Sequence, residues 1–151
     1  IFSDIIEKIS SKNIDGVYGD LQYVDFDKTD KVIRNWKNFD FNNKLLKKGW
    51  MPPHPTFFLK KGVYDKHGGF DLNYTISSDY DFMIRVLNDN SLKFCYIPRV
   101  ISKMRIGGSS NRSLRNILKK SKEDYLIIKK NNLGNFITLI RKNLLKINQY
   151  F

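Results

Sequence analysis

The sequence predicts a mixed α/β fold in which a sheet is flanked by helices. Short runs rich in Val, Ile, Tyr and Phe alternate with stretches whose apolar residues recur at helical spacing. Clusters of glycine, proline and asparagine separate these segments. Hydrophobic residues make up 41% of the 151-residue chain, which is enough to bury a core.

The first part of the chain contains most of the predicted strands. Residues 3–12 are expected to form a short amphipathic helix, because their apolar side chains recur at helical spacing. Gly19 and Asp20 are expected to form a turn between the first two strands. A helix is predicted over 41–48, whereas three prolines exclude a helix from 51–55. The strands predicted in this part are 14–18, 21–26, 32–36 and 56–59.

The second part is mainly helical. A short helix over 62–67 and a longer one over 78–87 precede two strands, 92–97 and 100–106, which are expected to meet at Pro98. The remainder is predicted to form two helices separated by a break over the asparagine-rich segment 131–135. The last helix is predicted to carry an apolar stripe: Phe136, Ile137, Ile140, Leu144 and Ile147.

Charge is distributed unevenly along the chain. The chain carries 27 basic and 15 acidic residues, and residues 111–151 hold ten of the basic and two of the acidic ones. We therefore expect a mixed-charge body over 1–110 and a basic helical segment over 111–151. One cysteine, Cys95, excludes an internal disulfide framework. Because the sequence begins with Ile1 and not Met, the chain is expected to be a piece of a longer protein.

Two carboxylates open the helix predicted over 78–87. Ser78 and Asp81 have the spacing of a capping box, in which the acidic side chain supports the helix start. Asp79 is not required for capping. At the start of a helix, its side chain is presented to any group that lies beyond the helix end. A carboxylate held there can act as a general base. Asp79 is therefore the candidate catalytic residue.

Two further segments have side chains suited to ligands. His54 lies between Pro53 and Pro55, where a stiff backbone fixes the direction of its imidazole. No second ligand-type side chain lies at metal-binding spacing, so no metal site is predicted there. The other segment is a glycine- and serine-rich turn flanked by arginines, whose free backbone N–H groups suit a phosphate; its residues include Arg105, Gly107, Gly108 and Ser109.

Four stretches, in register, resemble a family 2 glycosyltransferase of the bacterial type that builds surface polysaccharides. The matching stretches, which cover most of residues 17–111, are VYGDLQYVD (17–25), GWMPPHPTFFLKKGVYDKHGGFD (49–71), SSDYDFMIRVL (77–87) and KFCYIPRVISKMRIGGSSN (93–111). The resemblance implies part of a GT-A fold and inverting transfer of a sugar from a nucleotide-sugar donor. The donor-binding half of such an enzyme, with its Asp-x-Asp motif, is expected before Ile1.

The resemblance also implies roles for individual residues. Asp79 matches the general base, and His54 falls near the acceptor and donor-phosphate region. Asp81 and Arg85 resemble the neighbours that support the helix and contribute to substrate binding. The substrate-covering loop corresponds to Arg105, Gly107, Gly108 and Ser109. A divalent cation, Mn²⁺ or Mg²⁺, is expected in the complete enzyme but not on this chain alone, which is expected to be inactive.

The net charge of +12 supports an alternative from another class, a basic module that binds an anionic membrane surface or nucleic acid. Nucleic acid is disfavoured, because only Tyr125 and Phe136 interleave with the basic residues of the C-terminal helices. Peripheral membrane contact through these helices suits a lipid-linked or glycan acceptor, and simple packing on the body explains them equally well. The expected location is cytoplasmic, with the inner face of the membrane as the alternative.

Overall fold

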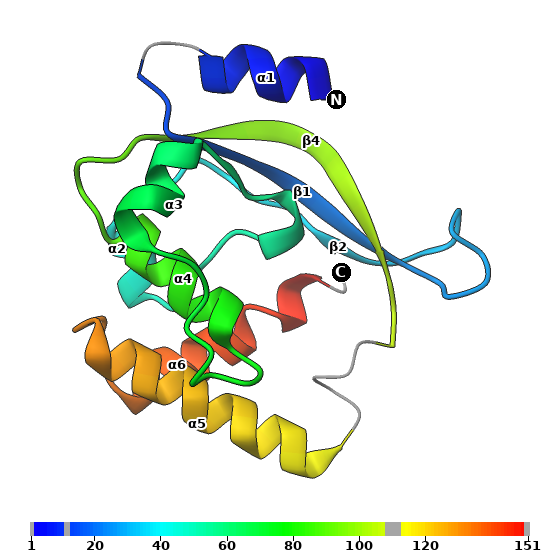
Figure 1. The fold of residues 1–151 in the computed structure, drawn as a ribbon. Coiled ribbons are helices and arrows are strands. Elements are labelled where there is room, and N and C mark those ends of the chain that lie inside the picture. The colour runs from blue at the N-terminus through cyan, green and yellow to red at the C-terminus, as the bar shows by residue number, and fades with distance from the viewer. Residues whose placement is uncertain (1, 11–12, 108–112, 150–151) are drawn as a thin grey trace.

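A four-stranded mixed sheet forms the centre of the computed structural model, which describes residues 2–10, 13–107 and 113–149 (Figure 1). The central strand, β1 (Gly16–Val24), runs antiparallel to β2 (Val32–Trp36) over one stretch and to β3 (Phe58–Leu59) over another. Along its whole length it pairs in parallel with β4 (Phe94–Arg105). This architecture confirms the mixed α/β class, with helices flanking a mixed sheet.

Both predicted breaks in the strands are wrong, because β1 and β4 are each continuous. A Cβ atom on Gly19 would lie 2.8 Å from Ile101 Cγ1 and 3.0 Å from the Arg99 carbonyl oxygen. Gly19 therefore allows close approach of β4 and does not form a turn. The ladder shifts register here, with Gly19 opposite Ile97 and Asp20 opposite Val100. Pro98 thus lies in an irregular stretch where its missing N–H breaks no ladder hydrogen bond.

Helices cover both faces of the sheet (Figure 1). Successive side chains of a strand point to opposite faces, and β1 follows this rule. Val17 packs with Ile5 of α1 (Phe2–Ser10), whereas Tyr18 belongs to the larger core on the other face. The face that carries Tyr18 is covered by five helices: α2 (Lys44–Lys47), α3 (Lys61–His67), α4 (Ser78–Leu87), α5 (Leu114–Lys130) and α6 (Phe136–Leu144).

The C-terminal helices share the main core with the sheet. Ile127 and Ile128 of α5 are fully buried, and Leu139 of α6 is only 5% exposed. All three pack in one cluster with Tyr18 of β1 and the apolar residues of α4. The basic segment over 111–151 therefore contributes to the same packed body as the sheet.

The predicted apolar stripe lies on the surface: Phe136, Ile137, Ile140 and Leu144 of α6, and Ile147 beyond the helix, are between 43% and 61% exposed. The buried residues of α6 are Thr138, Leu139 and Lys142 instead. The helix rests on Gly49, where a Cβ atom would lie 2.8 Å from both the Lys142 nitrogen and the Thr138 oxygen. This backbone contact, and not the hydrophobic pattern, sets the rotation of the helix.

Two shorter segments also differ from expectation. The helix predicted over 41–48 is reduced to the four residues of α2. Within the proline-rich segment, a 3₁₀ turn, η1 (His54–Thr56), forms where no helix was expected. Pro55 is tolerated there because it stands at the start of the turn, where its missing N–H has no helical partner. In the described parts of the chain, no helix is both long and apolar enough to cross a lipid bilayer.

Candidate functional site

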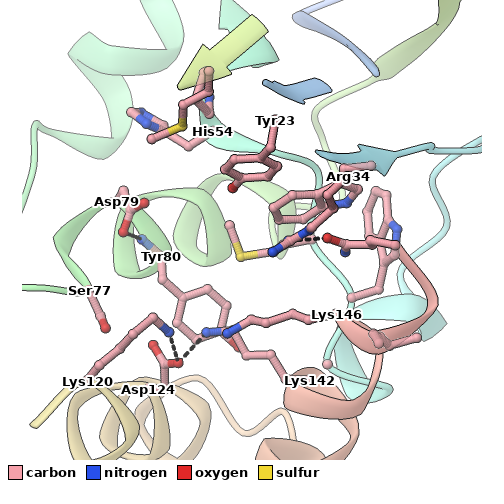
Figure 2. Close-up of a pocket in the computed structure, with 18 residues that line it drawn as sticks. Tyr23, Arg34, His54, Ser77, Asp79, Tyr80, Lys120, Asp124, Lys142 and Lys146 are labelled. Atoms are coloured by element: carbon pink, nitrogen blue, oxygen red, sulfur yellow. Dashed lines mark hydrogen bonds and ion pairs between the residues drawn. The ribbon is translucent and has the colours of Figure 1, made fainter. Parts of the chain in front are cut away.

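A pocket of about 300 Å³ opens between the sheet and helices α4, α5 and α6 (Figure 2). Asp79 of α4 and His54 of η1 both line it, so the structure brings together two of the residues singled out by the sequence. The sheet contributes Tyr23 from β1 and Arg34 from β2. The C-terminal helices supply most of the remaining charged side chains.

The start of α4, which carries Asp79, is held by a carboxylate from α5. Glu123 accepts hydrogen bonds from the backbone N–H groups of Thr75 (3.2 Å), Ile76 (2.9 Å) and Ser77 (2.9 Å). Burial pushes the pKa of Glu123 upward, but these N–H donors outweigh it and hold the pKa below its ordinary value. Glu123 therefore anchors the segment that leads into α4, including the N-cap Ser77, from 46 positions further along the chain.

The capping box expected from Ser78 and Asp81 does not form. The helix begins after Ser77, and the side chain of Ser77 makes no cap hydrogen bond. Of the two bonds of a capping box, Glu123 replaces only the one to the N-cap N–H, that of Ser77, while Asp79 Oδ1 accepts the N–H of Tyr80 within the first turn. Nothing local in the sequence signals a cap supplied by a helix more than 40 residues further on.

Asp79 itself is half-buried at the edge of the pocket. One of its carboxylate oxygens, Oδ1, accepts a hydrogen bond of 2.7 Å from the Tyr80 N–H, which fixes the direction of the side chain. His54 is positioned by the turn that contains it. In that turn Thr56 Oγ1 donates to the carbonyl oxygens of Pro53 (2.8 Å) and Gly19 (3.0 Å), tying the turn to β1.

Asp81 and Arg85 do not line the pocket. The Asp81 side chain is fully buried and accepts a 2.8 Å hydrogen bond from Arg85 Nε, while Lys130 Nζ lies 3.6 Å from its other oxygen. Arg85 also donates to the carbonyl oxygens of His67 and Gly69. These contacts attach α4 to the turn that follows α3. The structure therefore places both residues in support of the helix and away from the pocket.

The predicted phosphate-binding turn lies at the end of β4 and is described only in part. Arg105 is exposed, with its guanidinium 5.8 Å from the centre of the Phe26 ring. Gly107 is exposed with φ +101°, a conformation that favours glycine. Gly108 and Ser109 lie outside the described residues. From this segment, Met104 lines the pocket.

The base of the pocket contains a buried ion cluster that the sequence did not reveal. Asp124 Oδ2 lies 2.5 Å from Lys142 Nζ and 2.7 Å from Lys120 Nζ. Figure 2 shows the amino groups of Lys120, Lys142 and Lys146 gathered around Asp124. The Lys142 amino group also lies 3.5 Å from the centre of the Tyr80 ring, a cation–π contact. The one available signal is the four-residue spacing of Lys120 and Asp124, which is equally common in solvent-exposed helix pairs.

Burial dominates the electrostatics of this cluster. It lowers the pKa of Lys142 to about 7, although Asp124 acts in the opposite direction. It also lowers the pKa of Lys146 to about 8, assisted by the nearby charge of Lys120. For Asp124, burial raises the pKa, but Lys142 and Lys120 outweigh this effect and the pKa is lowered. Burial raises the pKa of the Tyr80 hydroxyl, which therefore keeps its proton.

Arg34 forms the opposite wall of the pocket. Its guanidinium lies 4.5 Å from the centre of the Tyr23 ring and 5.7 Å from that of Trp36. It also donates a hydrogen bond to Gln149 Oε1, in the short 3₁₀ turn η3 (Ile147–Gln149) that follows α6. These contacts connect β2 to the segment after α6 and close one side of the pocket.

Comparisons with known proteins do not assign the chain to a family. No family model matches it, and no significant match is found among curated proteins. Among the described residues, no group of three or more His, Cys, Asp or Glu side chains is arranged to hold a metal ion. The fold and the site define a mixed α/β protein with a pocket lined by several cationic side chains and by Asp79.

Proposed function

We propose that the chain is the acceptor-side part of a GT-A-like, nucleotide-sugar-dependent glycosyltransferase, with Asp79 as the general base. The observation that carries the proposal is the contrast between two carboxylates at one helix start. Asp79 opens into the pocket beside His54, whereas Asp81 is fully buried and engaged by Arg85. The quoted resemblance assigns the base to Asp79, which is the carboxylate with access to a ligand.

The chemistry assigned to Asp79 is a single proton transfer. As the acceptor hydroxyl oxygen bonds to the anomeric carbon of the donor, its proton passes to the Asp79 carboxylate. The bond from that carbon to the leaving phosphate oxygen breaks at the same time, which inverts the configuration. Positive charge in the pocket stabilises negative charge that develops nearby. The described residues do not form a ligand set for a metal ion, so no step is assigned to one.

The test measures transfer of a labelled sugar by the natural protein that carries these 151 residues. Asp79→Asn keeps an oxygen that can accept the Tyr80 N–H but removes basicity, so we expect turnover to fall about 10²–10⁴-fold. Thermal stability should change little. Undiminished turnover in Asp79→Asn would exclude Asp79 as the base.

The matched control is Asp81→Asn, one helical turn away. It leaves the Arg85 guanidinium without its carboxylate partner and should cost about 1–3 kcal/mol of stability, measured by urea unfolding. Turnover per folded molecule should remain within a fewfold of the original. If Asp81→Asn abolishes turnover while the protein stays folded, the assignment of the two carboxylates is reversed.

A second candidate function, binding to an anionic membrane surface, is favoured by one observation. The exposed apolar residues of α6, including Ile137 and Ile140, lie on the same short helix as the exposed Arg141. A helix with such a face can rest on anionic lipid. We expect co-sedimentation with phosphatidylglycerol vesicles at low salt, reduced in an Ile137→Ser/Ile140→Ser variant. Absence of binding to these vesicles would refute this candidate.

A further inference from the structure

Three buried polar atoms on residues that line the pocket have no hydrogen-bond partner among the described residues. They are Ser77 Oγ, Tyr80 Oη and Asp124 Oδ1, on residues that are only 1% to 2% exposed. Buried hydroxyl groups are almost always paired, because leaving them unpaired costs stability. Two of the three are hydroxyl groups on residues of the pocket wall that have a hydrogen bond still to donate, and such donors suit an acceptor-rich ligand.

The charged side chains around the pocket indicate that the ligand is an anion. Among the described lining residues, four cationic side chains (Arg34, Lys120, Lys142 and Lys146) face two carboxylates, Asp79 and Asp124. Asp124 already binds both Lys120 and Lys142 through Oδ2. With all four cationic groups protonated, the excess is two positive charges, which a doubly charged anion balances.

We propose that this pocket binds a phosphoryl group carried as a phosphate or diphosphate ester. Lys146, Lys120 and Arg34 supply positive charge, and the hydroxyl groups of Ser77 and Tyr80 donate hydrogen bonds to the phosphoryl oxygens. A phosphoryl group fits better than a carboxylate, because it offers more acceptor oxygens and up to two negative charges. The binding itself does not depend on enzymatic activity. The further statement that the bound phosphoryl group belongs to a substrate that reacts next to Asp79 rests on the proposed function.

The protonation of the lysines supports the same ligand class. With pKa values of about 7 for Lys142 and about 8 for Lys146, both amino groups are partly neutral near neutral pH. A bound anion favours their charged forms, so binding should take up protons from solution. The groups that face these lysines are Asp124 and Lys120 of α5, Tyr80 of α4 and Arg34 of β2.

Two kinds of ester share this chemistry, the leaving nucleoside diphosphate and a phosphorylated acceptor. Leu145 lines the charged pocket and also a second, more open groove, whose other lining residues are Leu144, Ile147, Lys48 and Arg141. An ester with an apolar tail can therefore extend from the charged pocket along the exposed face of α6. Farnesyl diphosphate represents this kind of ester, and UDP represents the nucleotide.

The experiment is calorimetric titration of the 151-residue chain with inorganic pyrophosphate. We expect saturable binding with proton uptake, detected as a dependence of the heat on buffer ionisation. Lys146→Met and Tyr80→Phe should each raise the Kd about tenfold or less, the value of one hydrogen bond to a charged group. Because the Tyr80 hydroxyl has no partner, Tyr80→Phe should not lower thermal stability. The control is Lys129→Met, an exposed lysine of α5 outside the pocket.

The competing outcomes are distinct. No saturable binding at millimolar pyrophosphate, or equal weakening by Lys129→Met, overturns the proposal. Displacement of pyrophosphate by farnesyl diphosphate assigns the pocket to a phosphorylated acceptor, and displacement by UDP assigns it to the leaving group. If neither ester competes, the pocket is not an ester site. Because binding is measured without turnover, a failed transferase assay leaves this result intact, and the reverse also holds.

Discussion

Helices α4 and α6 border the same pocket with opposite burial patterns. Apart from Asp81, the buried residues of α4 are apolar or aromatic, as in a helix packed against a sheet. Helix α6 buries a threonine, a leucine and a lysine, while four of its apolar residues are exposed. Apolar periodicity therefore predicts burial where a helix faces an apolar surface. It fails where backbone contact and an ion pair hold the helix.

The attachments of α6 explain the difference. Its backbone crosses Gly49 at a distance that excludes any Cβ atom, and Thr138 Oγ1 donates to the Lys47 carbonyl oxygen at 3.3 Å. Lys142 then reaches Asp124 of α5 inside the protein. Buried charge is costly unless it is paired, so this pair constrains the rotation of α6 strongly.

The largest effect that tests this comparison comes from breaking the ion pair on one side. Asp124→Asn removes the partner of two lysines, one of them fully buried, and should cost about 3–5 kcal/mol in urea unfolding. The double variant Asp124→Leu/Lys142→Met removes both buried charges and should recover most of that loss. If Asp124→Asn has near-normal stability, the ion pair between Asp124 and Lys142 does not hold α6 in place.

A smaller effect compares two apolar residues on α6 itself. Leu139→Ala creates a cavity in the main core and should cost about 2–5 kcal/mol. Ile137→Ala, two residues earlier on the exposed face, should change stability by no more than about 0.5 kcal/mol. Equal costs at the two positions would mean that α6 is rotated differently in solution.

The smallest expected effect is a pH dependence. Lys142 has a pKa of about 7 in the folded protein against an ordinary value of 10.5, so between these values the unfolded chain binds more protons. Stability from this group should therefore rise with pH, by about 1 kcal/mol between pH 7 and pH 8. Lys142→Met should flatten the rise, and an unchanged slope would assign it to another group.

Much of the fold was accessible from local sequence patterns. The bounds predicted for β2 and α4 agree with the structure. A polar turn precedes β2, and a continuous apolar face marks α4. Gly19 and Pro98 were misinterpreted as breaks, because glycine and proline punctuate turns and also permit irregular pairing within strands.

The candidate site was predictable only where its residues lie in short motifs. Asp79 and His54 belong to such motifs, and they line the same pocket. The Glu123 contact to the start of α4 and the Asp124–Lys142 pair join residues 18 to 48 positions apart. Lysine, glutamate and aspartate are ordinarily solvent-exposed on helices, so their burial here depends on tertiary packing that no local pattern encodes.

The hydrogen bond between Arg34 and Gln149 has a consequence for the order in which the protein matures on the ribosome. The two residues are 115 positions apart, and chains emerge from their N-terminal end at about 5–20 residues per second. Strand β2, which carries Arg34, therefore leaves the ribosome seconds before η3, which carries Gln149. Until η3 has been synthesised, the side of the pocket that Tyr23 and Trp36 line lacks the contact that closes it.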